Sequence, residues 1–257
     1  MLRLEGIDKT FNRGTVNEAQ LFSDFSLHIK KGEFVSVVGS NGSGKTTMLN
    51  IISGNTSIDS GKILLEDTDI TKLSEHKIAR RVGRVFQDPS FGTVPNMTIL
   101  ENMSLAENKG RPYSLVRAIN KKKYNYFREQ VVQLGLGLED KMNIPVGLLS
   151  GGQRQALSLI MTTMTPIDVL LLDEHTAALD PKTAEIIMEL TDKVVKEKKL
   201  TALMVTHNLR YSIEYGSRLI MMDKGNIVLD KDGEEKKNTK IDDILQIFNQ
   251  ISIECGN

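Results

Sequence analysis

The chain has 257 residues, of which 40% are hydrophobic and 26% charged, a composition typical of a globular α/β protein with one good-sized core or two small ones. Lys and Arg together number 33 and Asp and Glu also number 33, so the net charge is zero. A zero balance argues against a protein whose main task is to coat nucleic acid, and we expect no nucleic-acid partner.

Two features bear on the cellular compartment. The chain begins without a charged-then-apolar signal pattern, and its apolar runs are far shorter than the roughly 20 residues that a membrane helix needs. Its single cysteine, Cys255, cannot form an internal disulfide, which fits a reducing compartment. We therefore expect a cytoplasmic protein that reaches a membrane only through a partner.

The N-terminal part of the chain combines strands with one helix. Alternating apolar residues at 2–7 and 21–29 predict half-exposed strands, and the β-rich apolar run at 34–38 predicts a buried one. A Gly-rich loop then leads into a predicted helix at 45–53, which Gly54 ends, and 62–65 predicts a further strand.

Between about residues 88 and 150 helical signals replace strand signals, so this stretch predicts a mainly helical subdomain. Within it, residues 117–128 are basic, with tyrosines interleaved. Such a section could bind RNA. We favour a solvated helical face near a membrane partner, because anionic lipid lies close to such a partner.

Strands and helices alternate again after Gly152, and this order predicts a parallel sheet with crossover helices. The final section, 231–257, is polar and then weakly amphipathic, and it is too short for a domain. The predicted helices are 153–164 and 182–196, and the predicted strands are 169–172, 201–205, 218–223 and 226–229.

A phosphate-binding motif, G-x-x-x-x-G-K-[ST], lies at Gly39–Thr46, between a predicted strand and a predicted helix. Its glycines let the backbone wrap a polyphosphate, and the helix N-terminus directs N–H groups and partial positive charge at the anion. Lys45 would neutralise the β- and γ-phosphates, and the Thr46 hydroxyl would ligate Mg²⁺. A simple Gly-rich turn is the alternative interpretation.

Two carboxylates, Asp173 and Glu174, follow the apolar run 169–172. The C-terminal end of a parallel strand is where open α/β sheets place ligands. Asp173 would hold Mg²⁺ through water, and Glu174 would orient and polarise an attacking water. Strands that end in solvated acids are common, so this motif alone is weak.

A third motif, at the start of a predicted helix, comprises Leu149, Ser150, Gly151, Gly152 and Gln153. With it the chain resembles the ATP-binding-cassette family over nearly its whole length. The resemblance implies that this signature binds the γ-phosphate of an ATP held by the other subunit, through the Ser hydroxyl, the Gly N–H groups and the helix dipole.

Further residues match the family pattern in order. Gln87 matches the glutamine that reaches Mg²⁺ and the attacking water, and His207 matches the histidine that contacts the γ-phosphate and Glu174. The loop that crosses the dimer interface matches Ala178, Leu179 and Asp180. Phe11 resembles the aromatic residue that stacks on adenine, a position where the family more often has Tyr.

The resemblance thus implies a site for ATP and Mg²⁺. Its catalytic residues would be Lys45, Gln87, Glu174 and His207, and its metal ligands Thr46, Gln87 and Asp173. The residues expected to bind ATP are Phe11, Gly39, Ser40, Asn41, Gly42, Ser43, Gly44, Lys45, Thr46 and Thr47.

The implied fold is a P-loop NTPase: a RecA-like α/β core with a parallel sheet, an N-terminal antiparallel β part and an inserted α-helical subdomain. We expect one ATPase domain at 1–230, with its catalytic core at 1–88 and 157–230 and its helical subdomain at 89–156. Residues 231–257 would be a short tail.

One residue departs from the family pattern: His175 follows Glu174, where the family usually has Pro. A histidine there could titrate near neutral pH. We favour a neutral substitution in a loop. The string from Glu174 to Pro181 resembles importer ATPases that work with lipoprotein binding components, including those for aromatic amino acids.

These features predict an ATP-hydrolysing subunit that powers a membrane transporter. We expect a homodimer on ATP binding, permease subunits and an extracytoplasmic substrate-binding protein, with import of a small solute such as an amino acid. The alternatives are a soluble cassette without a permease, similar to an iron–sulfur-assembly scaffold, and the motor of an export or lipoprotein-release system. A non-hydrolysing regulatory cassette is disfavoured by intact Lys45, Glu174 and His207.

Overall fold

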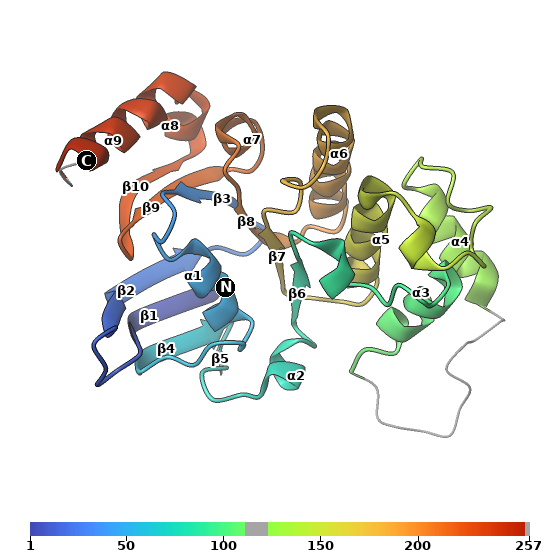
Figure 1. Cartoon of the computed structure of the whole chain (residues 1–257), viewed down its shortest axis with the longest axis horizontal. Helices are drawn as coiled ribbons and strands as arrows, with labels where there is room; N and C mark the ends of the chain where they lie inside the picture. The colour runs from blue at the N-terminus through green and yellow to red at the C-terminus, as the bar shows by residue number, and fades with distance from the viewer. Residues whose placement is uncertain (111–122, 255–257) are drawn as a thin grey trace.

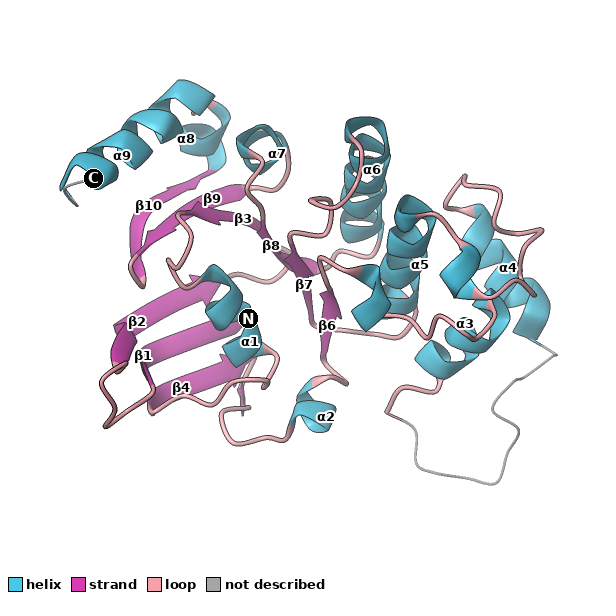
Figure 2. Ribbon diagram, viewed as in Figure 1, coloured by secondary structure: helices cyan, strands magenta, loops and turns pink. Residues whose placement is uncertain are grey.

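The computed structural model describes residues 1–110 and 123–254, and Figures 1 and 2 show two sheets with helices around them. The strands are β1 (Leu2–Phe11), β2 (Ala19–Ile29), β3 (Phe34–Gly39), β4 (Ser60–Leu65), β5 (Thr68–Asp69), β6 (Val82–Val85), β7 (Val169–Asp173), β8 (Thr201–Val205), β9 (Arg218–Asp223) and β10 (Asn226–Asp232). The α-helices are α1 (Lys45–Ile52), α2 (Glu75–Ile78), α3 (Ile99–Glu107), α4 (Tyr124–Val132), α5 (Gly151–Thr163), α6 (Pro181–Glu197), α7 (Leu209–Glu214), α8 (Gly233–Lys237) and α9 (Ile241–Glu254).

The six-stranded sheet has the order β10-β9-β3-β8-β7-β6, in which only the edge strand β10 is antiparallel to its neighbour. Strands β3, β7 and β8 are buried along their whole length, which explains why each is an unbroken run of mostly apolar residues. In β7, Leu170 and Leu172 pack into the core that lies against α5 and α6. Val169 and Leu171 pack into the core on the opposite face, since successive side chains alternate across a sheet.

The second sheet is antiparallel, with the order β2-β1-β4-β5. Its apolar residues, among them Leu4, Phe22 and Ile63, join Met48 and Leu49 of α1 in one core. Helix α1 is therefore held between the two sheets (Figure 1). The sheets thus fix the place of the loop that connects β3 to α1.

The segment between β6 and β7 is helical, as predicted. Its described part contains α3, α4, α5 and the 3-10 turns η1 (Pro89–Phe91) and η3 (Val146–Leu148). A capping box starts α3, where Thr98 accepts from the Glu101 N–H and the Glu101 carboxylate accepts from the Thr98 N–H. Figure 2 shows α3 and α4 beyond α5, away from the antiparallel sheet.

The predicted fold class is confirmed: a P-loop α/β core, an antiparallel β part and a helical insertion. The strands expected at 201–205 and 218–223 have those bounds. Strand β6 and the C-terminal helices α8 and α9 are present in the structure but were not predicted from the sequence. The predicted limits at 156 and 230 fall inside α5 and β10, and the domain limits stay a prediction.

Much of the basic section at 117–128 lies outside the described residues. In its described part, Lys123 pairs with Glu107, and Arg128 Nη2 lies 3.1 Å from Asp140 Oδ1. Both contacts are ion pairs within the helical segment. Across the described ranges 1–110 and 123–254, no helix has the length and apolarity to cross a membrane.

Candidate functional site

The loop between β3 and α1 ends at Gly44, which has φ of 101° and is the N-cap of α1. A side chain at Gly44 would strain this left-handed backbone and would lie 2.9 Å from the ring of Phe22. Ser40 Oγ donates to Asp223 Oδ1 at 2.6 Å, so the loop is tied to the end of β9. Helix α1 begins directly after this loop, and the N–H groups of a helix N-terminus favour an anion, as phosphate binding requires.

Lys45, the first residue of α1, is only 5% exposed. Its Nζ donates to the carbonyl oxygens of Gly39 at 2.9 Å and Ser40 at 2.7 Å. Burial lowers the pKa of Lys45, and the carboxylate of Glu174 acts in the opposite direction. The ammonium group is thus held inside the loop by carbonyl oxygens that a phosphate oxygen can replace.

Glu174 and His207 come from the ends of neighbouring parallel strands, β7 and β8. His207 Nε2 lies 2.6 Å from Glu174 Oε1. The Glu174 side chain is 16% exposed and the His207 side chain 46% exposed, so the pair is open to solvent on the histidine side.

The phosphate loop and this pair surround one cavity of about 160 Å³. The structure therefore brings together residues that are more than 100 positions apart in the chain. The cavity is lined by Asn41, Gly42, Gly44, Lys45, Thr46, Thr47, Glu174 and His207.

Asp173 has a partner that the sequence analysis missed. Arg84 Nη2 lies 2.6 Å from Asp173 Oδ2, and both side chains are nearly buried, at 10% and 12% exposed. Arg84 Nη1 also donates to Asn50 Oδ1 of α1 at 2.7 Å, and the guanidinium lies over the ring of Phe86. The available signal was a charged residue inside an apolar stretch, Val82 to Phe86.

Gln87 is exposed and follows β6, beside the end of β7 where Asp173 lies. It is not among the residues that line the 160 Å³ cavity. The carbonyl of the preceding residue, Phe86, accepts from Gln155 Nε2 of α5 at 3.0 Å. This bond links the segment after β6, which contains Gln87, to α5.

The signature residues lie at the start of α5. Ser150 is the N-cap, its Oγ accepts from the Gln153 N–H at 3.2 Å, and Gln153 Oε1 accepts from the Ser150 N–H. Ser150 and Gly151 are exposed, whereas Leu149 and Gly152 are buried. None of these residues lines the cavity beside Lys45, so within this one chain the signature is separate from the phosphate loop.

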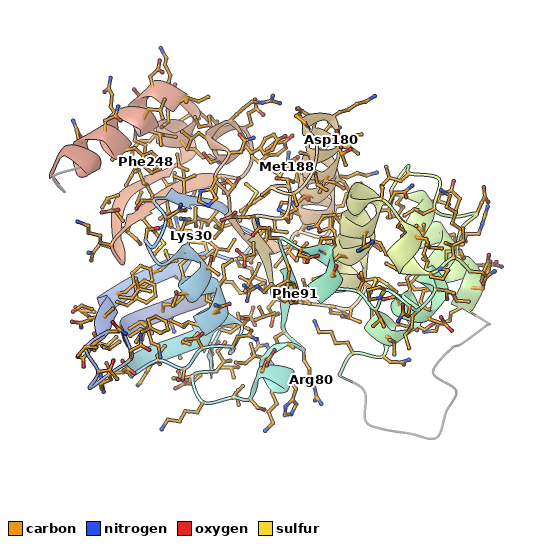
Figure 3. All side chains as sticks on the ribbon, viewed as in Figure 1. Lys30, Arg80, Phe91, Asp180, Met188 and Phe248 are labelled. Carbon is orange, nitrogen blue, oxygen red and sulfur yellow. The ribbon has the colours of Figure 1, made fainter. Side chains whose placement is uncertain are left out.

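The predicted interface loop is exposed at Ala178 and Asp180, and half-buried at Leu179. Asp180 is the N-cap of α6, where its Oδ1 accepts from the Thr183 N–H at 3.1 Å, and Figure 3 shows it at one end of that helix. Phe11, at the end of β1, is 37% exposed and has Lys9 Nζ 5.1 Å from its ring centre. The ring is accessible but does not line the cavity.

Comparison with known proteins gives the family. The model of the ABC transporter family matches residues 22–177. The chain is 50% identical to the tyrosine transport ATP-binding protein of Clostridioides difficile (strain R20291), over 96% of this chain and 98% of the relative. It is 32% identical to the phosphonates import ATP-binding protein PhnC of Lactococcus lactis subsp. cremoris (strain SK11), over 96% and 99%.

Solved structures agree with this assignment. A dimeric ATP-binding cassette in a post-hydrolysis state bound to ADP and Pi matches with a TM-score of 0.76 and 30% identity, over 90% of this chain and 98% of that one. The ADP conformation of an ATP-binding cassette of an ABC transporter matches with a TM-score of 0.79 and 26% identity, over 100% and 99%. The chain belongs to the ABC transporter family. Within that family it is an ATP-binding subunit that hydrolyses ATP.

Proposed function

We propose that this chain is the motor of a membrane importer for a small solute, and that the cavity beside Lys45 is where it binds and hydrolyses ATP. The observation that carries the proposal is the meeting of the phosphate loop with the Glu174–His207 pair around that cavity. A loop of N–H donors, a buried cation and a carboxylate near solvent are the groups that phosphoryl transfer to water needs.

In the proposed complex, phosphate oxygens replace the carbonyl acceptors of Lys45, and its ammonium group neutralises the β- and γ-phosphates. The backbone from Gly39 to Gly44 and the side chains of Thr46 and Thr47 surround the phosphates. Phe11 stacks on the adenine ring. Stacking needs only an accessible aromatic face, which a phenylalanine supplies as well as a tyrosine.

The proposed metal ligands are Thr46, Gln87 and Asp173, which offer a hydroxyl, an amide oxygen and a carboxylate. Such hard oxygen donors suit Mg²⁺, and Asp173 keeps Oδ1 available because Arg84 contacts only Oδ2. When bound with ATP, Mg²⁺ would neutralise charge on the β- and γ-phosphates. Gln87 is exposed at the end of β6, from which it would have to approach the phosphates.

Glu174 is the proposed residue that positions the attacking water and accepts its proton. The water oxygen forms a bond to the γ-phosphorus while the bond from that phosphorus to the β–γ bridging oxygen breaks, and ADP leaves with the electron pair. His207, 2.6 Å from Glu174, holds the carboxylate in place and contacts the γ-phosphate.

A second chain completes the proposed site. At the start of α5, where a helix N-terminus favours an anion, Ser150 and Gly151 are exposed and Gly152 is buried. The proposed contacts come from the Ser150 hydroxyl and from the N–H groups of Gly151 and Gly152. They would contact the γ-phosphate held by the partner chain in a homodimer. The dimeric cassettes among the similar structures support this arrangement.

The proposed partners follow from the relatives, whose names describe tyrosine transport and phosphonate and methionine import. We propose permease subunits that hold this chain at the cytoplasmic face of the membrane, and an extracytoplasmic substrate-binding protein. The 50% identity to a tyrosine transport protein favours an amino acid as the solute.

Replacement of Glu174 by Gln tests the hydrolytic role. We expect Glu174→Gln to bind ATP with wild-type affinity and to hydrolyse it at least about 100-fold more slowly, because an amide cannot accept the proton of water. Glu189→Gln is the matched control, since Glu189 is exposed on α6 and outside the site. Wild-type turnover by Glu174→Gln would contradict the proposed role.

Replacement of Ser150 by Arg tests the shared site. A single Ser150→Arg chain should still bind ATP through its own phosphate loop, whereas hydrolysis should be lost because the partner's γ-phosphate is no longer covered. Nucleotide binding and steady-state turnover measured together separate the two effects. Normal turnover would exclude a site completed by the signature.

The transport role is tested by affinity purification of the tagged chain from gently solubilised native membranes. We expect a polytopic permease and a binding protein to copurify. A permease without a binding protein would favour export. A soluble assembly with no membrane partner would overturn the transporter role and leave only the ATPase.

A further inference from the structure

The loop that follows β7 begins with a strained residue. Glu174 has φ of 46°, in the left-handed region that residues with a Cβ rarely adopt. Its N–H donates to the Val205 carbonyl at 3.0 Å, and its own carbonyl accepts from the Ala177 N–H at 2.9 Å. Such a backbone persists only where neighbouring contacts hold it, and the direction of the Glu174 carboxylate depends on it.

The next residue, His175, is turned into the protein interior and is 2% exposed. Its Nε2 lies 3.0 Å from Oγ1 of Thr191, which is fully buried in the middle of α6. The Thr191 hydroxyl already donates its proton to the Ile187 carbonyl at 2.7 Å. Thr191 Oγ1 is therefore the acceptor in the contact with His175, and the imidazole carries its proton on Nε2.

This hydrogen bond ties the start of the loop to the helix that the loop leads into. The loop runs from Glu174 to Asp180, the N-cap of α6, and the His175–Thr191 bond reaches α6 beyond that cap. A buried imidazole without a partner would cost free energy, so the bond favours one position of the ring and of the backbone that carries it.

We infer that His175 and Thr191 form a positioning pair that holds the left-handed backbone of Glu174, and so aims the carboxylate at the attacking water. Neither residue touches the nucleotide in this account. The inference rests on the proposed role of Glu174. It assigns to His175 a purpose in hydrolysis, in place of the neutral loop substitution that its position alone favoured.

Thr191→Val is the most direct test, because it removes one hydroxyl and keeps the shape of the side chain. We expect kcat for ATP hydrolysis to fall by at least about fivefold, since a small displacement of a catalytic group is costly. The KM for ATP and the affinity for ATP should stay within about twofold of wild type, because the phosphate loop is untouched.

Thr163→Val is the matched control. Thr163 is 4% exposed in α5, and its hydroxyl donates to the Leu159 carbonyl at 2.9 Å, with no imidazole attached. Thr191→Val should lose more Tm than Thr163→Val, because it also leaves the buried His175 imidazole without an acceptor, so turnover is compared at a temperature well below both Tm values. Only Thr191→Val should lower kcat. If the effect were purely structural, kcat would instead fall equally in both variants or in neither.

Two conservative variants complete the experiment. Thr191→Ser keeps the hydroxyl, and His175→Gln places an amide N–H near the position of Nε2. In both variants kcat should stay within about twofold of the wild-type value. His175→Phe should lower kcat as Thr191→Val does. The double variant His175→Phe/Thr191→Val should be no slower than either single variant, because each substitution removes the same hydrogen bond.

Steady-state hydrolysis by these variants beside Glu174→Gln gives a clear decision. We expect Glu174→Gln to hydrolyse almost no ATP, Thr191→Val to hydrolyse it slowly, and Thr163→Val to hydrolyse it at the wild-type rate. If Glu174→Gln were inactive while Thr191→Val hydrolysed ATP as Thr163→Val does, the positioning pair would be wrong and the proposed function would stand. Wild-type turnover by Glu174→Gln would overturn the role of Glu174 itself.

Discussion

Arg84 places a positive charge in the protein interior, where it contacts Asp173 and Asn50. A buried charge that loses its partner remains desolvated, so removal of Arg84 leaves the Asp173 carboxylate uncompensated. We expect Arg84→Met to lower the free energy of unfolding by about 3–5 kcal/mol, measured by urea denaturation without nucleotide. Arg84→Lys should recover part of this loss, because it keeps the charge but not the planar fork.

Arg210→Met is the control for that prediction. Arg210 also pairs with carboxylates, those of Glu185 and Glu214, but its side chain is 49% exposed. Solvent weakens such pairs, so its removal should have a much smaller effect. Equal losses for Arg84→Met and Arg210→Met would show that the Arg84–Asp173 pair is not a buried one in solution.

His175 makes stability depend on pH. Burial lowers its pKa from 6.5 to about 4, so the unfolded chain binds this proton more readily than the folded one. The stabilisation is therefore complete above pH 6.5 and is lost as the pH falls toward 4. Between pH 7 and pH 5 the wild type should lose about 2 kcal/mol more unfolding free energy than His175→Phe. Parallel pH profiles for the two proteins would contradict this assignment.

At the scale of elements, the turn between β9 and β10 supports the phosphate loop. The Gly225 N–H donates to the Ser43 carbonyl at 3.1 Å, and a Cβ at Gly225 would lie 1.7 Å from the Leu21 carbonyl oxygen. Gly225 also has φ of 80°, so a side chain there would strain the turn and push it away from the Leu21 carbonyl of β2, which would disturb the bond to Ser43.

We therefore expect Gly225→Ala to weaken ATP binding by about tenfold, because it displaces Ser43 and the N–H groups beside it. Gly233→Ala is the matched control: φ is 47° and the position is open, with no atom within 4 Å of an added Cβ. Titration with ATP under the same conditions compares the two. Equal affinities would mean that the turn does not support the loop.

The strongest sequence signals came from elements whose pattern is set by burial on both faces. The apolar runs of β3, β7 and β8 predicted these strands, and the loop after β3 was evident from its glycines. Strand β6 was missed because it has only four residues and contains Gly83 and Arg84, neither of which is typical of a strand. Arg84 pairs with Asp173 at the end of β7, the strand beside β6 in the sheet. The spacing of the two residues along the chain does not reveal this pairing.

As with the strands, part of the candidate site could be predicted from the sequence and part could not. Lys45, Glu174 and His207, to which the resemblance assigned catalytic roles, line one cavity, and those roles stay predictions. The bond from His175 to Thr191 was not predictable, because the two residues meet only after α6 folds back along the sheet. A histidine next to a catalytic candidate looks like a titrating group in sequence, whereas in the structure it is buried and hydrogen-bonded.

At the scale of the whole molecule, the proposed ATP site needs two chains. Within one chain, the exposed signature at Ser150 does not line the cavity beside Lys45. The wall of the site that is missing in the single chain would come from the partner's α5. A dimer of this kind has two equivalent sites related by a twofold axis, so each chain supplies one half of each site.

Mixing two inactive variants tests this claim most directly. Glu174→Gln lacks the proposed base and Ser150→Arg lacks the proposed signature contact, so each variant alone should be nearly inactive. In a mixed dimer, the phosphate loop and Glu174 of the Ser150→Arg chain meet the intact signature of the other chain, which restores one site of two. With random pairing in an equimolar mixture, half of the dimers are mixed and each has one active site of two, so we expect about a quarter of wild-type turnover. Mixed dimers that form but hydrolyse no more ATP than the separate variants would contradict it.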